Sequence, residues 1–176
     1  MQKDLSRLIY RELINGNVIN KLHCQGDHLV PNPLFDELAN EFNREHYEQL
    51  YSYIGFEIKQ LGDCFFLNEF GKDDVLSDVA MKVQCLLVVL CRGITQIPLL
   101  TSVITDHNAG LSETHLEVMS KNDEYLQILS AVGFKHSFSK ELDNVLVTRK
   151  FAYWNHLDRL VLSDGGIALL DHMQGV

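Results

Sequence analysis

The chain has 176 residues, of which 46% are hydrophobic, and this composition is ordinary for a globular protein that buries a core. It excludes an intrinsically disordered chain. The formal net charge is -9, from 15 Lys plus Arg against 24 Asp plus Glu, which argues against a free-standing protein that binds nucleic acid through bulk positive charge.

The N-terminal segment, Met1 to Gly16, has no apolar run of the kind found in secretory signals or membrane anchors. We therefore expect a cytoplasmic protein. Apolar residues recur in this segment at helical spacing, at Leu5, Leu8, Ile9 and Leu13. This pattern predicts a helix over residues 4–15 that ends at Gly16.

The next segment, Asn17 to Val30, is mixed in composition and contains glycines, so we expect a loop with room for a short helix around Val18 to His23. It also holds four potential metal ligands: His23, Cys24, Asp27 and His28. Structural zinc normally needs two spaced ligand pairs, and the chain has no second cluster of this density. We therefore predict no metal and no cofactor, and we expect the other cysteines, Cys64, Cys85 and Cys91, to be buried as small hydrophobic residues.

Pro33 suits the first turn of a helix whose apolar face is formed by Leu34, Phe35, Leu38 and Phe42. Asn43 can cap a further helix that ends at Gly55, with an apolar face formed by Tyr47, Leu50, Tyr51 and Ile54. The two helices can also run together as one bent helix. Their acidic residues form one helical face: Asp36, Glu37, Glu41, Glu45 and Glu48.

The apolar period changes after Gly55. Phe56 to Gln60 alternates between apolar and polar residues, Gly62 and Asp63 can form a turn, and Cys64 to Asn68 can return as a second strand. These features predict a β-hairpin. Helices followed by a two-stranded hairpin are typical of a winged-helix domain.

The longest apolar stretch, Leu76 to Arg92, predicts a helix of about four turns. Asp74 and Ser77 can cap its start, and Gly93 suits its end. Its apolar residues extend round more than one side, so the helix must be covered on more than one face. We expect it to connect two similar halves.

The second half repeats the plan of the first half. Thr95 can cap a helix through Ile104, and two further helices are expected after Ser112 and after Ser120. Phe134 to Phe138 and Val145 to Arg149 then predict a second hairpin. We expect a closing helix over residues 154–162, followed after Gly165 and Gly166 by an apolar segment whose type, strand or helix, stays open.

The sequence thus predicts a mainly α fold with small β-hairpins (α+β), organised as tandem winged-helix domains. The expected parts are an N-terminal domain (residues 1–75), a connecting helix (76–93) and a C-terminal domain (94–176). The chain contains no phosphate-binding glycine loop and no nucleophile elbow, so we expect no enzymatic activity. Winged helices serve DNA binding, protein binding and dimerisation alike, so the fold alone does not select a function.

The order of four segments resembles the MukE and MksE subunits of bacterial condensins, which are kleisin-interacting tandem winged-helix proteins. The segments are Asn32 to Phe35, Tyr47 to Tyr53, the hairpin strands and the long Leu76 to Arg92 helix. The resemblance extends from about Pro31 to Trp154. The chain has no long acidic extension after the second predicted hairpin, so the MksE type is the closer analogy.

This resemblance implies a non-enzymatic accessory subunit that dimerises and binds a kleisin chain. The kleisin joins the heads of a coiled-coil SMC-like ATPase that compacts DNA, in chromosome segregation or in plasmid defence. We therefore expect a cytoplasmic, nucleoid-associated homodimer without membrane contact. The acidic helical face, or a groove between the winged-helix pairs, is the expected kleisin-binding surface.

Residues 121–150 carry a local charge balance of +1 in a chain whose total is -9, and are therefore the candidate DNA-facing surface. Their basic residues are Lys121, Lys135, Lys140, Arg149 and Lys150. We expect weak, salt-dependent DNA binding through the second wing. The alternative functions are a winged-helix transcription regulator that reads DNA through the helix over residues 121–131 and, less favoured, a small metal-dependent enzyme.

Overall fold

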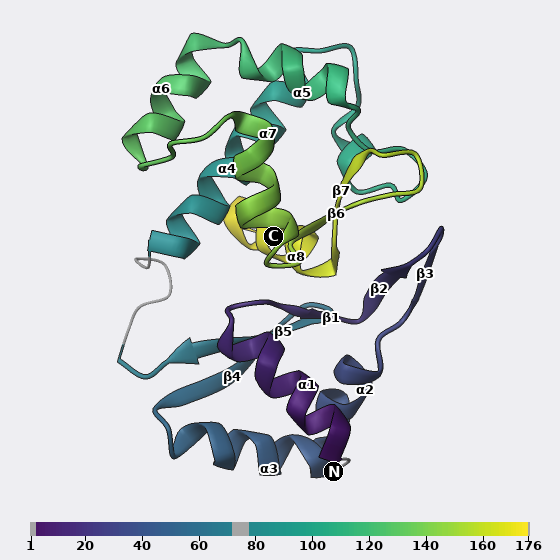
Figure 1. Cartoon of the computed structure of the whole chain (residues 1–176), viewed down its shortest axis with the longest axis vertical. Coiled ribbons are helices and arrows are strands. Elements are labelled where there is room, and N and C mark those ends of the chain that lie inside the picture. Colours follow the sequence, from purple (N-terminus) through teal and green to yellow (C-terminus); the bar gives the residue numbers. More distant parts are fainter. Residues whose placement is uncertain (1–2, 72–77, 176) are drawn as a thin grey trace.

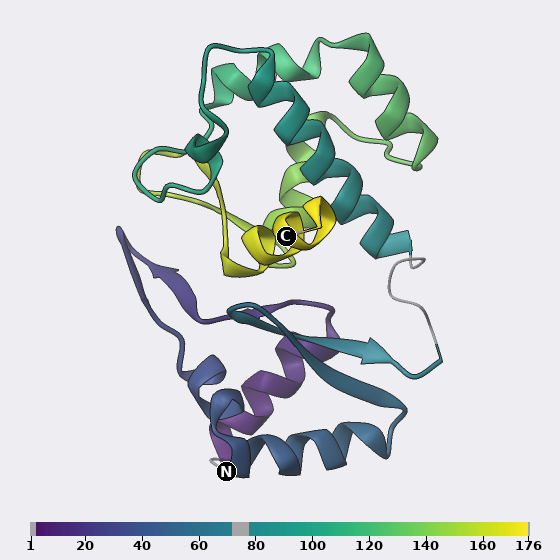
Figure 2. The same cartoon turned by 180° about the vertical axis from the view of Figure 1, so that it is seen from behind.

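The computed structural model describes residues 3–71 and 78–175. The described chain is mainly helical with small antiparallel sheets, which confirms the predicted fold class. Residues 3–71 form one body and residues 78–175 form a second body, and the two lie against each other in both views (Figures 1 and 2).

The first body contains three helices and five strands. In chain order they are α1 (Lys3–Ile14), β1 (Ile19–Asn20), β2 (Leu22–Gln25), β3 (His28–Pro31), α2 (Pro33–Ala39), α3 (Glu41–Ser52), β4 (Phe56–Leu61) and β5 (Cys64–Glu69). The hairpin β4–β5 is the one that the sequence predicted, and Gly62, with φ of 53°, lies in its turn. Strand β1 pairs with β5, so this antiparallel sheet has the order β1-β5-β4.

The core of the first body is formed by one face from each helix packed on one face of the sheet. Its buried residues are Ile9, Leu13, Ile19, Phe35, Leu38, Tyr47, Tyr51, Ile58 and Phe65. The rings of Phe35 and Phe65 lie 5.0 Å apart between centroids. Phe42, which the sequence placed on the apolar face of the first of these two helices, is 70% exposed and lies outside this core. The N-cap of α3 is Asn40 rather than the predicted Asn43: the Asn40 side chain accepts a hydrogen bond from the Asn43 N–H.

The segment after Gly16 corrects a prediction. Residues 17–31 form the short strand β1 and the hairpin β2–β3, rather than a loop with a short helix. Gly26, with φ of 60°, supplies the turn between β2 and β3. Strand β1 (Ile19–Asn20) pairs with β5 and so adds a third strand to the sheet, and the Ile19 side chain is fully buried there.

Helix α4 (Asp78–Thr95) is the predicted long helix, although the proposed caps Asp74 and Ser77 lie outside the described residues. The helix does not end at Gly93, which is buried against Met119: a Cβ on this glycine would lie 2.6 Å from the Met119 sulfur. Gly93 therefore allows close packing rather than helix termination. The buried residues of α4 all belong to the core of the second body: Val83, Leu86, Leu87, Val89, Leu90 and Ile94.

The second body wraps α4 with short helices and one hairpin. Its remaining elements are the 3-10 helix η2 (Thr101–Ile104), α5 (Glu113–Ser120), α6 (Asp123–Ala131), α7 (Phe138–Glu141), the π-helix η3 (Leu142–Val147), β6 (Ala152–Trp154), β7 (Leu160–Leu162) and α8 (Asp164–Gln174). The helices expected after Ser112 and after Ser120 are confirmed. The helix expected from Thr95 to Ile104 is reduced to η2, and Leu100 before it is 80% exposed.

The predicted second hairpin is wrong. Residues 138–147 are helical, and their buried residues Phe138, Leu142, Val145 and Leu146 recur at helical spacing. The buried Glu141 carboxylate accepts hydrogen bonds from the N–H groups of Lys135 and His136, at 3.1 and 2.9 Å, and so occupies donors that the first predicted strand would need. The hairpin of this body is β6–β7, at the position of the predicted closing helix. The apolar segment near the C-terminus is a helix, α8, capped by Ser163.

Candidate functional site

The two bodies are joined through the side chain of Asn20, which is only 6% exposed. Its Nδ2 donates to the Lys150 carbonyl at 2.8 Å, and its Oδ1 accepts from the Gly165 N–H at 2.7 Å. The Ser163 hydroxyl donates to the same Lys150 carbonyl at 2.6 Å. Lys150 holds a left-handed backbone conformation, with φ of 66°, that turns its carbonyl toward both donors.

The side chains of Arg149 and Lys150 reinforce this joint. Lys150 Nζ lies 2.7 Å from the Glu12 carboxylate, and Arg149 Nη1 donates to the Gly16 carbonyl at 3.4 Å. On the opposite side, the Leu22 N–H donates to Asp164 at 2.8 Å. Arg149 and Lys150 therefore hold the first body, and they do not lie on a wing as the sequence predicted.

A groove of about 810 Å³ lies beside this joint. Its floor is the outer face of the hairpin β4–β5, and its walls are the first turns of α4, the segment around Arg149 and the helix α8. The basic side chains at the groove are Lys59, Arg149 and His172, and its one acidic side chain is Glu57. Its apolar lining includes Leu61, Phe66, Phe70, Val79, Val83, Phe151 and Leu169.

The other three predicted DNA-facing residues are exposed but scattered. Lys121 follows the end of α5, Lys135 lies in the loop before α7, and Lys140 lies in α7. Together with Arg149 and Lys150 they do not form one hairpin surface.

The predicted acidic face contains four exposed residues, Asp36, Glu41, Glu45 and Glu48. The fifth residue, Glu37, is buried at 8% exposure and accepts a hydrogen bond from the Tyr47 hydroxyl at 3.2 Å. A partner that approaches the acidic face therefore meets the other four side chains, while Glu37 belongs to the packing of α2 on α3.

The potential metal ligands His23, Cys24, Asp27 and His28 lie along the hairpin β2–β3 and its turn. Within residues 3–71 and 78–175, no group of three or more His, Cys, Asp or Glu side chains is arranged to hold a metal ion. The Asp27 carbonyl instead lies 3.3 Å from His107 Nε2 of the second body. The hairpin thus acts as a contact between the bodies.

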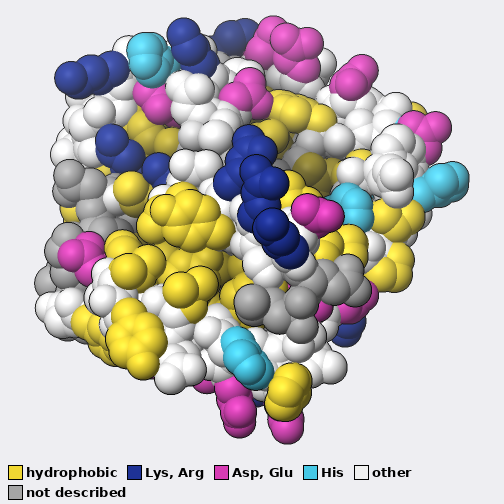
Figure 3. Space-filling model, turned by 60° about the horizontal axis from the view of Figure 1, so that its bottom comes forward, with side chains coloured by type: hydrophobic (Ala, Val, Ile, Leu, Met, Phe, Trp, Pro, Cys, Tyr) yellow, Lys and Arg dark blue, Asp and Glu magenta, His cyan; other side chains and the backbone are white. Residues whose placement is uncertain are grey.

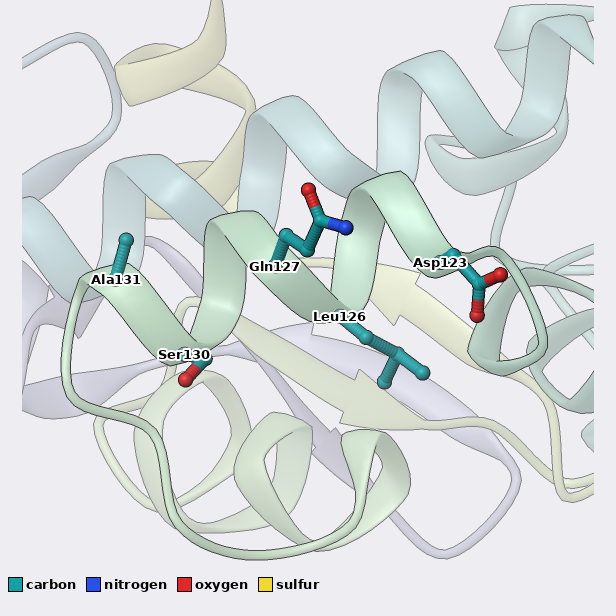
Figure 4. Close-up of a pocket in the computed structure, with 5 residues that line it drawn as sticks. All are labelled: Asp123, Leu126, Gln127, Ser130 and Ala131. Atoms are coloured by element: carbon teal, nitrogen blue, oxygen red, sulfur yellow. The ribbon is translucent and has the colours of Figure 1, made fainter.

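The outer face of α6 is the surface that a winged-helix regulator would place on DNA. A shallow depression on this face is lined by Asp123, Leu126, Gln127, Ser130 and Ala131, and their side chains point outward or along the helix (Figure 4). Leu126 is 45% exposed, and the lining contains no Lys or Arg. The lining of this depression therefore offers no positively charged side chain for phosphate contact.

One surface escaped the sequence analysis. Helices α1 and α3 meet where Ser6 hydrogen-bonds to Tyr47 at 2.8 Å, and beside this contact several apolar side chains are 40% or more exposed: Tyr10, Ile14, Leu50, Tyr53 and Ile54. We call these five residues the α1–α3 patch. Figure 3 shows hydrophobic side chains gathered beside a ridge of Lys and Arg.

The basic residues of α1 run along its exposed side at four-residue spacing: Lys3, Arg7 and Arg11. The four-residue spacing of these basic residues can be read from the sequence, but the net charge of -9 directed attention to acidic surfaces instead. The first body therefore exposes an apolar patch with a basic row beside it on α1.

Within the described residues, no helix has the length and apolar content needed to cross a membrane. Neither a curated protein nor a solved structure matches the chain. The family model described as condensin complex protein MksE matches residues 4–173, nearly the whole chain. The matched family consists of condensin complex subunits and is not a family of enzymes. The chain therefore belongs to the MksE family of condensin complex proteins.

Proposed function

We propose that this condensin complex subunit acts by binding a kleisin chain, and through it an SMC-like ATPase, without catalysing a reaction itself. The observation that carries the proposal is the family match over residues 4–173. The groove between the two bodies and the four exposed acids of α2 and α3 are the surfaces that can hold such a chain. We place this function in the cytoplasm, on the nucleoid.

Co-expression with the kleisin encoded beside this protein tests the proposal. We expect the two chains to leave a size-exclusion column as one complex at low and at moderate salt, because a packed apolar interface is screened little by ions. Separate elution at both salt concentrations would refute kleisin binding.

We also propose that both bodies are winged-helix domains, with α4 as the first helix of the second. In the first body, a helix, a short strand, two helices and a hairpin follow in order, with the additional hairpin β2–β3 between the short strand and the two helices; the short strand pairs with the second strand of the hairpin β4–β5. In the second body, α4, Leu111, α5, α6 and β6–β7 follow the same order, and Leu111 pairs with Leu160 of β7. The repeated order supports the tandem arrangement, but with α4 inside the second domain: we propose a division into residues 1–75 and 76–176, in place of a separate connecting helix over residues 76–93.

We further propose a homodimer formed through the α1–α3 patch. The patch exposes large apolar side chains, and contiguous surfaces of this kind mark association sites. The basic row of α1 lies near it, whereas α3 carries an acidic row formed by Glu41, Glu45 and Glu48. Two copies related by a two-fold axis can bury their patches against each other and leave this acidic row exposed for the kleisin.

The DNA-regulator alternative gains no support from the outer face of α6, which lacks basic residues. We propose that DNA is contacted weakly by this chain and mainly through the assembled complex.

A further inference from the structure

Helix α3 carries a stripe of exposed side chains along its outer side. Its members recur at spacings of four, three and four residues: Phe42, His46, Gln49 and Tyr53. We call these four residues the α3 stripe. Phe42 is 70% and Tyr53 is 79% exposed, whereas the opposite side of the helix is buried in the core of the first body. Helix α3 lies at the edge of the first body farthest from the second body (Figures 1 and 2), so the stripe faces outward.

Contacts within the α3 stripe order its side chains. The rings of Phe42 and His46 lie edge to face with their centroids 5.0 Å apart, and His46 Nδ1 lies 2.8 Å from the Phe42 carbonyl oxygen. Gln49 Nε2 donates a hydrogen bond to the Tyr53 hydroxyl at 3.3 Å. A side chain that is already ordered loses less conformational entropy when a partner covers it. The stripe is therefore arranged for contact before a partner binds.

The spacing of the α3 stripe indicates the shape of its partner. Steps of four and three residues follow one side of a helix in the same way as the contact line between two packed helices. Peptides bound in an extended conformation instead add to the edge of a sheet, and α3 offers no such edge. From Phe42 to Tyr53 the stripe is about 17 Å long, at 1.5 Å for each residue. The partner that matches it is a helix of about three turns lying along α3.

The acidic row of α3 indicates the charge of this partner. Glu41, Glu45 and Glu48 are exposed and lie together on one flank of the stripe, because they also follow steps of four and three residues. Arg44 Nε lies 3.6 Å from Glu48, so the row has one cation beside its three carboxylates. Carboxylates at this flank repel the phosphates of nucleic acid and attract Lys or Arg side chains of a protein.

We propose that the α3 stripe binds a single amphipathic helix of the kleisin. Its apolar side covers Phe42 and Tyr53, and its Lys or Arg side chains face the acidic row. A coiled coil does not fit, because its two helices already bury their apolar side chains against each other. The inference rests on the proposed function, to which it adds the shape and charge of the bound segment. Only Tyr53 is shared with the α1–α3 patch, so a second copy on that patch leaves the Phe42 end of the stripe accessible.

Isothermal titration of the purified kleisin into two variants tests the inference. Phe42→Asp should weaken binding about tenfold or more, because it replaces an apolar anchor with a charge. Glu45→Lys should weaken binding about threefold or more at low salt and less at high salt, because ions screen the repulsion. Both residues are exposed, so the melting temperatures should stay close to that of wild type. Leu100→Asp and Glu117→Lys are the matched controls, with the same charges introduced at exposed residues of the second body.

Hydrogen exchange of the kleisin locates the bound segment. The segment protected by the wild-type protein, and not by Phe42→Asp, should have apolar residues at steps of four and three, with Lys or Arg beside them. Replacing these Lys or Arg residues with Glu should restore binding to Glu45→Lys. A variant that had only lost stability would not be rescued in this way.

The outcomes separate this inference from the proposed function. Weaker binding by Phe42→Asp and Glu45→Lys, with both controls like wild type, supports the α3 stripe as the site of the helix. Equal binding by wild type and both variants overturns the inference while kleisin binding stands. If wild type itself fails to bind the kleisin, the proposed function and the inference both fail. A protected segment without helical spacing overturns the inference. A lower oligomeric mass of Phe42→Asp assigns the stripe to a second copy and also overturns it.

Discussion

Neighbouring residues of α4 differ sharply in their surroundings. Leu87 is fully buried, whereas Val88, the next residue, is 39% exposed. We predict that Leu87→Asp abolishes folding, because an unpaired buried charge costs about 4 kcal/mol or more against a total stability of about 5–15 kcal/mol. Val88→Asp is the matched control and should lose less than about 1 kcal/mol.

Thermal unfolding followed by circular dichroism measures both variants. An unchanged melting curve for Leu87→Asp would mean that α4 is a surface helix, in conflict with its place in the core of the second body.

Single residues also mark the limit of sequence analysis. Gly93 follows a long apolar run, and a glycine at that place usually ends a helix. Here it continues the helix, because the space that a Cβ would occupy is taken by Met119 of α5. Glycine can either end a helix or allow another element to pack closely against it, and only the tertiary contact shows which of the two applies. Glu37 is a similar case, since its burial depends on Tyr47 from the next helix.

At the level of elements, the contact between α1 and the segment after η3 predicts a pH-dependent stability. Burial alone would raise the pKa of Glu12, but hydrogen bonds from Lys150 and Asn17 and the charge of Lys150 outweigh it, so the pKa is lowered from 4.5. A group with a lowered folded pKa stabilises the protein above its unfolded pKa, and this contribution is lost as pH falls through the folded pKa.

We therefore expect Glu12→Gln to be less stable than wild type by about 1 kcal/mol or less above about pH 5, because the pair is partly exposed. The difference should shrink below about pH 4 as wild-type Glu12 becomes protonated. Thermal melts of both proteins over this range measure it. Lys150→Gln should reproduce the trend, and a difference that grows on acidification would contradict the assigned ion pair.

The elements of the first body were largely predictable because local signals and tertiary packing agree. The hairpin β4–β5 combines an alternating first strand, an apolar second strand and a Gly-Asp turn. The buried apolar residues Phe138, Leu142, Val145 and Leu146 instead recur at helical spacing. Glu141 also accepts hydrogen bonds from the backbone N–H groups of Lys135 and His136, just before this helical segment. The hairpin β2–β3 was missed because it lacks an alternating apolar pattern and contacts the second body through backbone groups, the Leu22 N–H and the Asp27 carbonyl.

At the level of the whole molecule, the α1–α3 patch predicts the oligomeric state. Light scattering at micromolar concentration should give about twice the protomer mass of 20.1 kDa. Tyr10→Asp with Ile54→Asp should give the protomer mass, because both charges would be placed inside the interface. Leu126→Asp, at an exposed leucine on α6, is the control and should remain dimeric. A wild-type mass of 20.1 kDa would contradict the homodimer.

DNA binding by the protein alone should be weak, with a Kd of about 1–100 μM at physiological salt and no sequence preference. Of the basic residues predicted from sequence, Lys121, Lys135 and Lys140 are exposed, whereas Arg149 and Lys150 contact the first body. Lys135→Glu with Lys140→Glu should lower the salt dependence of binding by about one unit for each lost contact. Fluorescence anisotropy with random and genomic DNA measures the affinity and its salt dependence. Tight, sequence-selective binding would favour the alternative function, a transcription regulator.

The sequence indicated the family and the class of fold, but it did not indicate which surfaces are available. The groove depends on how α8 and the joint at Asn20 place one body against the other, and these contacts connect residues more than a hundred positions apart. The basic row of α1 was present in the sequence, yet its importance depends on the adjacent α1–α3 patch.

The central claim is that this chain functions by holding a kleisin. Isothermal titration of the purified kleisin into the purified protein tests it most directly, in buffer of moderate salt without nucleotide or metal. We predict saturable binding with a Kd below about 1 μM. Absence of binding at protein concentrations up to about 100 μM, with both chains folded, would contradict it.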